Sequence, residues 1–368
     1  MNKRIVVSGG GTGGHIYPAI GIADALLKLD SGIEIIFIGG ADRLEATIVP
    51  KHGFRFLGIS VAGFPRKPTW KWFPVLGKVG LGIMQSLRLL KQLNPSIAIG
   101  TGGYVSGPVL FAASLRGIPT VIQDQNAAPG LTNRLLGRRA KAAYLSFETA
   151  ATHFPDRIVQ ITGNPIRPTI ASFERASTTY ENFGLDPDRK TVCVMGGSQG
   201  AQAINQVVTA TLDELTPLHE QMQIIHQTGK TDYKEVQSCY SNSRLLHLVQ
   251  PYFDPVEEVY SIADLMVCRA GGMTVSEVTA CGIPAIFIPL PAMAGNNQRL
   301  NAKAVEDGGG CILLEQSTLT GTELAGEITN LLTDSARLRQ MADASRKLGN
   351  PQASEDIAKS IYAIVNRN

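Results

Sequence analysis

Four glycine-rich stretches each follow an apolar run and precede a helical pattern: Gly9–Gly14, Gly100–Gly107, Gly196–Gly200 and Gly271–Gly272. Glycine lets the backbone approach a ligand closely and turn sharply, and a helix start offers free N–H donors to an anion. A single stretch of this kind is as often a plain strand-to-helix turn. Four of them favour a cleft that binds more than one phosphate group.

The first stretch has the spacing Gly9-x-Gly11-x-x-Gly14, which fits the dinucleotide-binding fingerprint. That fingerprint expects an acid about 20 residues further on, at the end of the second strand, to hold a ribose. Here the second apolar run ends in "FIGGADR", with glycines at that place. An NAD-dependent oxidoreductase is therefore disfavoured, and a P-loop is excluded because no Gly-Lys-Ser/Thr follows.

The segment "CRAGGMTVSEVTACGIP" combines a cation, two glycines and a carboxylate around a predicted helix start. Arg269 follows the strand and can neutralise diphosphate charge, while Glu277 lies one to two turns into the helix and can accept hydrogen bonds from ribose hydroxyls. A surface ion pair and a solvated helix face would explain each residue separately. Together with the glycines they favour a nucleotide site.

His15 closes the first glycine stretch at the start of a predicted helix. A neutral imidazole can take a proton from a hydroxyl, and the positive end of a helix favours the neutral form. A capping or packing histidine is the alternative. The other histidines and the five scattered cysteines show no ligand spacing, so we expect no metal, no cofactor and no disulfide frame.

The bulk numbers describe a packed two-domain protein of 368 residues, with 44% hydrophobic and 18% charged residues. A net charge of +3 is too mild to predict a nucleic-acid partner. Reduced thiols indicate a cytoplasmic protein. No apolar run approaches the roughly 18 residues of a membrane span, and none resembles a signal peptide.

Residues 64–93 mix aromatic and aliphatic side chains with lysines and arginines, and they contain both tryptophans of the chain. Such a mixture suits a membrane interface, although an ordinary helix packed on a sheet is the alternative. The residues expected to contact the membrane are Trp70, Trp72, Phe73, Leu76 and Ile83.

Strand and helix patterns alternate along the chain, which predicts parallel sheets with helices on both faces. The first series contains "RIVVS", "EIIFIG", "IAIGTG", "TVIQD" and "AAYLSF". Residues 163–190 are rich in Pro, Asn, Asp, Ser and Thr and are interpreted as the interdomain connection. The second series contains "TVCVMGG", "MQIIHQTG", "LLHLVQ", "DLMVCRAG", "AIFIPLP" and "CILLEQ", and residues 334–367 are predicted to form terminal helices.

Eight motifs occur in an order and at distances that resemble the bacterial MurG family. They are "GGGTGGHIYPA", "ADRLEATIVPKHGF", "GTGGYVSGP", "DQNAAPGLTNRLL", "GNPIR", "GGSQGAQAIN", "CRAGGMTVSE" and "NQRLNA", and they span about residue 3 to about residue 365. The resemblance implies an α/β fold of the GT-B type, in which two Rossmann-like domains with parallel sheets face one another across a cleft. The domains would be residues 1–165 for the acceptor and membrane, 166–345 for UDP-GlcNAc, and a helix in 346–368 that returns to the first domain.

The resemblance also implies an activity, namely inverting transfer of N-acetylglucosamine from UDP-GlcNAc to the 4-hydroxyl of MurNAc in lipid I, which forms lipid II for peptidoglycan. The enzyme would work as a peripheral protein at the cytoplasmic face of the plasma membrane, on an anionic surface and beside other cell-wall synthesis proteins. Such enzymes support cell shape and cell division.

Site residues carry over from the family motif by motif. The catalytic candidates are His15 and Asp124, and the acceptor would meet Gly11, Thr12, Gly103, Tyr104 and Asn126. The donor would meet Thr12, Gly13, Gly14, Asn126, Arg167, Ser198, Gln199, Asn205, Tyr252, Phe253, Arg269, Thr274, Glu277 and Gln298.

The sequence departs from the family pattern at three places. Asp124 stands where the family often has a longer acid, Gly295 and Asn297 replace Asp and His near the donor sugar, and Tyr252-Phe253 is bulkier than usual. Two further alternatives stay open beside the oxidoreductase. They are a related glycosyltransferase with another lipid or small-molecule acceptor, and a non-catalytic sugar-nucleotide binding protein at a membrane.

Overall fold

The computed structural model describes residues 3–63, 72–171, 177–197, 199–291 and 296–367. The chain divides into two compact units. Unit 1 comprises Met1–Arg167 together with Pro351–Asn368, and unit 2 comprises Pro168–Asn350.

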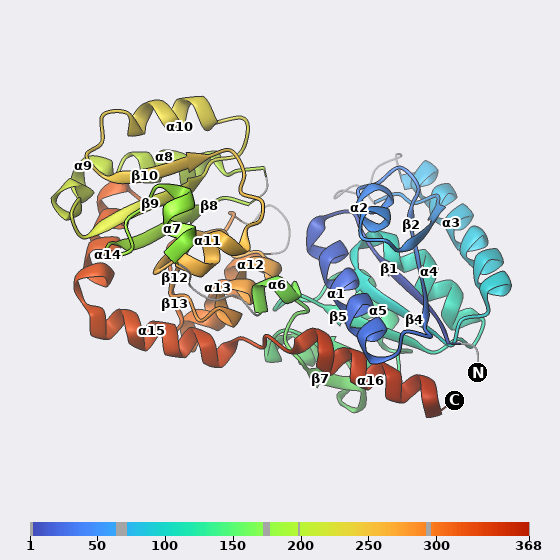
Figure 1. Ribbon diagram of the computed structural model, residues 1–368. Coiled ribbons are helices and arrows are strands. Elements are labelled where there is room, and N and C mark those ends of the chain that lie inside the picture. The colour runs from blue at the N-terminus through green and yellow to red at the C-terminus, as the bar shows by residue number, and fades with distance from the viewer. Residues whose placement is uncertain (1–2, 64–71, 172–176, 198, 292–295, 368) are drawn as a thin grey trace. The chain divides into compact units, whose positions relative to one another are not determined.

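Unit 1 is built on a parallel sheet, which within the described residues has seven strands in the order β3-β2-β1-β4-β5-β6-β7 (Figure 1). The strands are β1 (Arg4–Gly9), β2 (Glu34–Gly40), β3 (Arg55–Ile59), β4 (Ile97–Gly102), β5 (Thr120–Asp124), β6 (Ala142–Leu145) and β7 (Val159–Ile161). The central strands are apolar runs because helices cover both faces of a parallel sheet. All carboxyl ends meet at one edge, where the glycine stretches of this unit lie.

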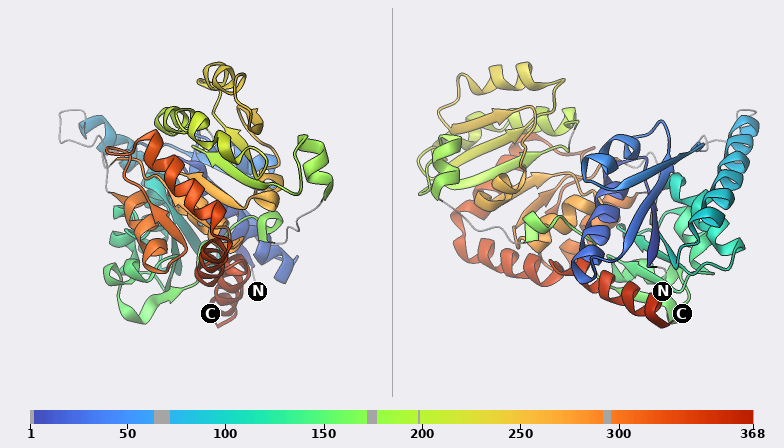
Figure 2. Two further views of the ribbon diagram at one scale, coloured as in Figure 1. Left: turned by 90° about the vertical axis from the view of Figure 1, so that its left-hand side faces the viewer. Right: turned by 45° about the vertical axis from the view of Figure 1, so that its right-hand side comes forward.

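Helices cover both faces of this sheet. They are α1 (Gly13–Leu29), α2 (Glu45–Lys51), α3 (Trp72–Leu93), α4 (Gly103–Leu115), α5 (Leu131–Gly137) and α16 (Ala353–Arg367). Successive residues of β1 point to opposite faces. Ile5 and Val7 pack in the layer of α1 and α16, whereas Val6 packs in the layer of α3 and α4. Figure 2 shows α3 lying along α4 at the outside of this second layer.

The last helix of the chain belongs to unit 1, as the fold class predicts. Ile357 and Ile361 on α16 are fully buried in the layer that α1 forms. The Tyr144 hydroxyl donates to Ser360 Oγ at 2.9 Å, and the Tyr362 hydroxyl donates to Asp30 Oδ2 at 3.1 Å. Both apolar and polar contacts therefore hold the C-terminal segment against the first unit.

Unit 2 repeats the parallel design, with six strands among its described residues in the order β10-β9-β8-β11-β12-β13. The strands are β8 (Lys190–Met195), β9 (Met222–Gln227), β10 (Leu246–Gln250), β11 (Leu265–Cys268), β12 (Ala285–Phe287) and β13 (Cys311–Leu313). The helices are α6 (Pro168–Ala171), α7 (Ser177–Phe183), α8 (Gln202–Thr209), α9 (Leu212–Leu215), α10 (Tyr233–Tyr240), α11 (Glu257–Ile262), α12 (Gly272–Ala280), α13 (Asn297–Asp307), α14 (Gly321–Thr333) and α15 (Ser335–Leu348).

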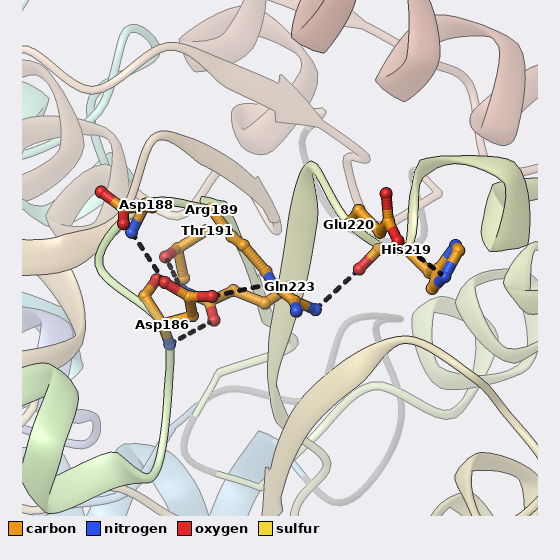
Figure 3. Close-up of polar contacts among 7 residues, drawn as sticks. All are labelled: Asp186, Asp188, Arg189, Thr191, His219, Glu220 and Gln223. Carbon is orange, nitrogen blue, oxygen red and sulfur yellow. Dashed lines mark hydrogen bonds and ion pairs between the residues drawn. The ribbon is translucent and has the colours of Figure 1, made fainter.

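A polar cluster fixes the amino ends of β8 and β9 in unit 2 (Figure 3). Gln223 Nε2 donates to Thr191 Oγ1 at 2.9 Å and to the Asp186 carbonyl at 2.8 Å. Arg189 donates to the Asp186 carboxylate at 3.1 Å and to the His219 carbonyl at 2.7 Å. This cluster lies at the sheet edge opposite the glycine loops, so we assign its charges to folding.

The observed strands confirm the alternating pattern that the sequence predicts, with boundaries shifted by a few residues. Two strands are absent from the sequence expectation. β3 is an edge strand in which only Ile59 is fully buried, and β7 has three residues that are mostly exposed. Neither carries the continuous apolar run that marks a buried parallel strand.

Candidate functional site

The first glycine stretch lies at the carboxyl edge of the unit 1 sheet, between β1 and α1. Gly11 has a φ of +85°, a left-handed conformation that glycine adopts without strain. α1 begins at Gly13, after Thr12, whose side chain makes no capping hydrogen bond. In the described part of the chain the Gly13 and Gly14 amides donate to no acceptor, so the start of α1 offers two N–H groups to an anion.

His15 is held at this junction through one ring nitrogen. Its Nδ1 lies 3.0 Å from the Thr101 carbonyl oxygen, which also accepts from Gln125 Nε2 at 2.6 Å. A carbonyl can only accept, so Nδ1 carries a hydrogen, and in the neutral ring Nε2 is the nitrogen that has the lone pair. The Thr101 hydroxyl in turn donates to the His15 carbonyl at 2.7 Å. The half-buried ring therefore has a fixed tautomer in which Nε2 can accept a proton.

The second glycine stretch, between β4 and α4, packs directly on the first. Gly103 has a φ of +77°, and a methyl group there would overlap the carbonyl oxygen of Gly10. The Tyr104 ring lies against Gly11, where an added methyl group would be 3.3 Å from the ring. Gly11, Thr12, Gly103 and Tyr104, which the family resemblance assigns to the acceptor, are thus neighbours of His15 at one sheet edge.

Asp124 ends β5 and is almost fully buried. Its carboxylate accepts from the Asn126 amide at 3.1 Å, the Gly130 amide at 3.0 Å and Asn133 Nδ2 at 2.8 Å. Burial raises the pKa of Asp124 above its ordinary value, and these hydrogen bonds partly offset the rise. Both oxygens are engaged, so the geometry makes Asp124 an anchor of the loop that carries Asn126.

Arg167 ends the first segment of unit 1, and the chain continues into unit 2 at Pro168. Its guanidinium carbon lies 5.7 Å from the centroid of the Tyr17 ring. Tyr17 follows His15 by two residues on α1. A cation therefore lies beside the first turns of the helix whose start offers the free amides.

In unit 2 the glycine loop between β8 and α8 is tied to a second segment by one side chain. Gly197 and Gly200 have φ values of +99° and +80°. Gln227 Nε2 donates to the Gly197 carbonyl at 3.1 Å, and its Oε1 accepts from the Phe253 amide at 3.0 Å. Gln227, at the end of β9, thus fixes the glycine loop relative to residue 253.

The residues that the resemblance assigns around this loop differ in exposure. Ser198 lies outside the described residues, and Gln199 is exposed. Tyr252 is also exposed, whereas Phe253 is buried with its ring centroid 5.9 Å from that of Phe183. Because the Phe253 amide already donates to Gln227, the exposed Tyr252 side chain is the group of this pair that stays accessible at the surface.

Asn205 on α8 takes part in a buried polar network. Its Nδ2 donates to the Thr228 carbonyl at 2.9 Å and to Asp232 Oδ2 at 2.8 Å. Its Oδ1 lies 3.0 Å from His226 Nε2, and His226 Nδ1 lies 3.0 Å from the Tyr240 hydroxyl. Burial lowers the pKa of His226 to about 3, so the ring is neutral. The observed contacts of Asn205 are those of a side chain that supports the sheet.

Arg269 and Glu277 lie on either side of the turn between β11 and α12. Arg269 donates from Nη1 to the Ile288 carbonyl at 2.9 Å and from Nη2 to Gln316 Oε1 at 2.7 Å. Burial lowers the pKa of Arg269 from its ordinary value. Glu277 Oε2 accepts from the Tyr260 hydroxyl at 2.9 Å. Both charged groups are largely buried and held by hydrogen bonds, which fixes their positions at this turn.

Two further predicted donor residues lie at helix starts of the same sheet edge. Thr274 is half-buried in the first turn of α12. Gln298 is in the first turn of α13, and its Oε1 accepts from the Leu290 amide at 2.9 Å. Of the two departures from the family pattern near the donor sugar, Gly295 lies outside the described residues, and Asn297 is the first residue of α13.

The predicted membrane segment is described only in part. Trp70 lies outside the described residues, as do the side chains of Trp72 and Phe73 at the start of α3. Leu76 and Met84 on α3 are 52% and 51% exposed. These side chains are therefore not part of the core, and membrane contact by this face of α3 stays a prediction.

An apolar pocket of about 590 Å³ lies beside this face, between α3, α4 and α5. Val79 and Ile83 line it from α3, Phe111 from α4, and Leu135 and Arg139 from the α5 region. Among the described residues, no helix is long and apolar enough to cross a membrane. Those residues also contain no group of three or more His, Cys, Asp or Glu side chains that could hold a metal ion.

Within the described residues, several of the predicted residues lie at one sheet edge in each unit. His15, Tyr104 and the α1 amides share an edge of the first sheet, and Arg269, Glu277 and Gln298 share an edge of the second. Sequence reasoning did not single out Glu45 or Gln227, which contact the two glycine loops. Glu45 lies in the family motif "ADRLEATIVPKHGF", whereas no sequence signal distinguishes Gln227 from other polar residues at strand ends.

Comparison with protein families identifies both halves of the chain. Residues 5–145 match the glycosyltransferase family 28 N-terminal domain, and residues 191–361 match the glycosyltransferase family 28 C-terminal domain.

Curated relatives are similar over nearly the whole chain. A protein of Halothermothrix orenii is 42% identical, with 97% of this chain and 98% of the relative covered, and one of Desulforamulus reducens is 41% identical, with 99% of each covered. Both are named UDP-N-acetylglucosamine--N-acetylmuramyl-(pentapeptide) pyrophosphoryl-undecaprenol N-acetylglucosamine transferase.

Solved structures agree with this relationship. The crystal structure of Acinetobacter baumannii MurG superposes with a TM-score of 0.77 at 29% identity, covering 98% of this chain and 99% of that one. A UDP-GlcNAc 2-epimerase from Neisseria meningitidis bound to UDP-GlcNAc shares the fold, with a TM-score of 0.71 at 14% identity over 99% of this chain and 100% of that one.

Proposed function

Because the chain belongs to the MurG family of N-acetylglucosamine transferases, we propose that it transfers N-acetylglucosamine from UDP-GlcNAc to lipid I, the undecaprenyl-diphosphate-linked MurNAc-pentapeptide. The product is lipid II, the precursor on which peptidoglycan synthesis, and through it cell shape and division, depends. Unit 1 takes the acceptor, and unit 2 takes the donor.

The observation that carries this proposal is the contact of His15 Nδ1 with the Thr101 carbonyl oxygen at 3.0 Å. The Thr101 carbonyl occupies Nδ1, which leaves Nε2 as a base beside the free amides of α1. In the reaction the acceptor 4-hydroxyl attacks C1 of GlcNAc and gives its proton to Nε2. The bond from C1 to the diphosphate oxygen breaks, UDP leaves with the electron pair, and the configuration at C1 inverts.

Unit 2 supplies the donor contacts. Arg269 stabilises the charge that develops on the leaving diphosphate, and Glu277, oriented by the Tyr260 hydroxyl, accepts from the ribose hydroxyls. Gln298 contacts the GlcNAc ring. Burial of both charged groups strengthens these interactions because water screens them less.

Unit 1 also meets the lipid. The exposed apolar residues of α3, the pocket beside them and Lys78 suit a peripheral contact with an anionic bilayer at the cytoplasmic face of the plasma membrane. The polyprenyl chain of the acceptor lies in that same bilayer, so the contact brings unit 1 to its substrate. Other cell-wall synthesis proteins at this surface are further partners.

One assay tests the reaction class and the acceptor together. UDP release from UDP-GlcNAc is measured with a lipid I analogue, with diacylglycerol, and with no acceptor. Release that depends on the lipid I analogue supports the proposal. Release with diacylglycerol alone would indicate a related transferase with another acceptor, and binding without turnover would indicate a sugar-nucleotide binding protein.

The base is tested by His15→Ala and His15→Asn. Loss of a general base costs about 10²- to 10⁴-fold in rate, so we expect kcat to fall by that amount while the Kd for UDP stays as in wild type. His153→Ala, at an exposed histidine, is the matched control. Near-wild-type turnover in His15→Asn would mean that His15 only caps or packs, and an equal loss of UDP affinity would place it in the donor site.

A further inference from the structure

A buried carboxylate lies behind the first glycine loop, in the motif "ADRLEATIVPKHGF", to which the proposed reaction assigns no role. Glu45 is the first residue of α2 and is 1% exposed. Burying a charged group is costly unless hydrogen bonds or an opposite charge compensate it. Its compensation therefore indicates what the residue does.

Backbone amides from two segments provide that compensation. Glu45 Oε2 accepts from the Gly11 amide at 3.0 Å, and Oε1 accepts from the Gly40 amide at 2.9 Å. No cation pairs with this carboxylate within the described residues. Bonds from amides to a carboxylate are stronger than bonds between neutral groups, so Glu45 fixes Gly11 against the end of β2.

The neighbouring glycines leave room for this contact. A methyl group at Gly10 would overlap the Glu45 carboxylate, and one at Gly39 would lie 2.8 Å from Glu45 Cγ. Two glycines from different strand ends thus surround one side chain. The left-handed Gly11, with its amide turned to Glu45, leads directly into Thr12, the free amides of α1 and His15.

We propose that Glu45 is a positioning residue for the acceptor, an inference that rests on the proposed function. It holds the glycine loop in the one conformation that presents the Gly13 and Gly14 amides and His15 together. It also occupies the Gly11 amide, and its negative charge keeps phosphate oxygens away from that position. The acceptor diphosphate is accordingly received at the start of α1 and not along the whole loop.

The test compares Glu45→Gln with Asp42→Asn. Glutamine keeps the shape but replaces one oxygen by an NH₂ group that faces an amide N–H, so either Gly11 or Gly40 loses its acceptor. Asp42 is exposed, pairs with Arg43 at 3.7 Å, and lies three residues away, which makes its variant a matched control for charge. Acceptor KM, kcat and its pH profile are measured with a lipid I analogue, UDP Kd by calorimetry, and folding by thermal unfolding.

We expect Glu45→Gln to raise the acceptor KM about tenfold, the size of one lost hydrogen bond, with UDP Kd within about twofold of wild type. Asp42→Asn should match wild type. An unchanged acceptor KM would overturn the proposal, whether or not kcat and its pH profile change, and so would a loss of UDP affinity equal to the loss of turnover.

A second variant keeps the test decisive if Glu45→Gln does not fold. Glu45→Asp keeps the charge but is one methylene too short to reach both amides, so its acceptor KM should rise as well, and a wild-type value would overturn the proposal. If the wild-type enzyme shows no UDP release that depends on the lipid I analogue, the proposed function has failed. If wild type transfers and the Glu45 variants behave like it, only the role of Glu45 has failed.

Discussion

The buried histidine of unit 2 should make the stability of that unit depend on pH. His226 is fully buried between Asn205 and Tyr240, and burial lowers its pKa from 6.5 to about 3. The unfolded chain binds a proton below about pH 6.5, whereas the folded chain does not until about pH 3. Folding is therefore unaffected by this group above pH 6.5 and is progressively opposed as the pH falls from 6.5 towards 3.

The size of the effect follows from these two pKa values. Proton linkage gives a loss of about 2 kcal/mol in the free energy of unfolding between pH 7 and pH 5. That is a large share of the roughly 5–15 kcal/mol that stabilises a typical domain. His226→Gln keeps an amide donor for Asn205 but does not titrate, so this part of the pH dependence should disappear.

Hydrogen exchange of peptides from β8 and β9 would measure the unfolding free energy of unit 2 in wild type, His226→Gln and the exposed-site control His153→Gln. The difference between wild type and His226→Gln should change by about 2 kcal/mol between pH 7 and pH 5, and the control should follow wild type. A difference that is the same at both pH values would refute the assignment of the slope to His226.

Two further predictions concern ligands. Glu277→Ala should weaken UDP binding by about 1–3 kcal/mol, or about 5- to 150-fold, because the ribose hydroxyls lose a charged acceptor. Calorimetry would measure the Kd for UDP, with Glu235→Ala at an exposed glutamate as the control. An unchanged Kd in a folded Glu277→Ala protein would remove Glu277 from the ribose site. Replacing Leu76, Leu81 and Met84 together by serine should reduce co-sedimentation with anionic liposomes, because about 0.8 kcal/mol is lost per CH₂ group no longer buried in lipid. The control Leu348→Ser, at an exposed leucine of unit 2, should sediment like wild type. Equal sedimentation of all three proteins would contradict a membrane role for α3.

The sequence could predict the strand-to-helix junctions because a buried parallel strand and a glycine turn both leave local patterns. β1, β4, β8 and β11 are apolar runs that end at glycines or at Arg269, so both the sheets and the edge that carries the site were predictable. β3 and β7 were not, since neither carries a continuous apolar run, whereas the edge strands β10 and β13 of the second sheet do and were predicted. Local patterns thus record the burial of a strand, and they miss a strand such as β7 whose residues are mostly exposed.

The side chains behind the loops could not be predicted, since their partners are distant in the sequence. Glu45 contacts an amide 34 residues away, and Gln227 contacts a carbonyl 30 residues away. Asn205 shows the converse limit. It lies in the "GGSQGAQAIN" motif, yet it falls on the inward face of α8 with Ile204 and Val208, and its amide bonds inside the unit. A motif marks a region of the fold without saying which of its residues meets the ligand.

The two glycine loops are anchored by side chains of opposite hydrogen-bonding character. In unit 1 the Glu45 carboxylate occupies an amide of the loop, whereas in unit 2 the Gln227 amide group occupies a carbonyl. The first loop therefore gives up one N–H donor to its anchor and gains a fixed negative charge nearby, whereas the anchor of the second loop takes no N–H donor from that loop and adds no charge. In the proposed reaction the donor diphosphate takes up charge as its bond to C1 breaks, while the acceptor diphosphate lies away from the reacting hydroxyl and does not change. The Gln227 anchor in unit 2, which uses a loop carbonyl, suits binding of the donor diphosphate. It leaves the backbone donors and the positive potential of that loop for the leaving group. The Glu45 anchor in unit 1, which uses a loop amide, suits binding of the acceptor diphosphate, because that group has to be positioned and develops no new charge.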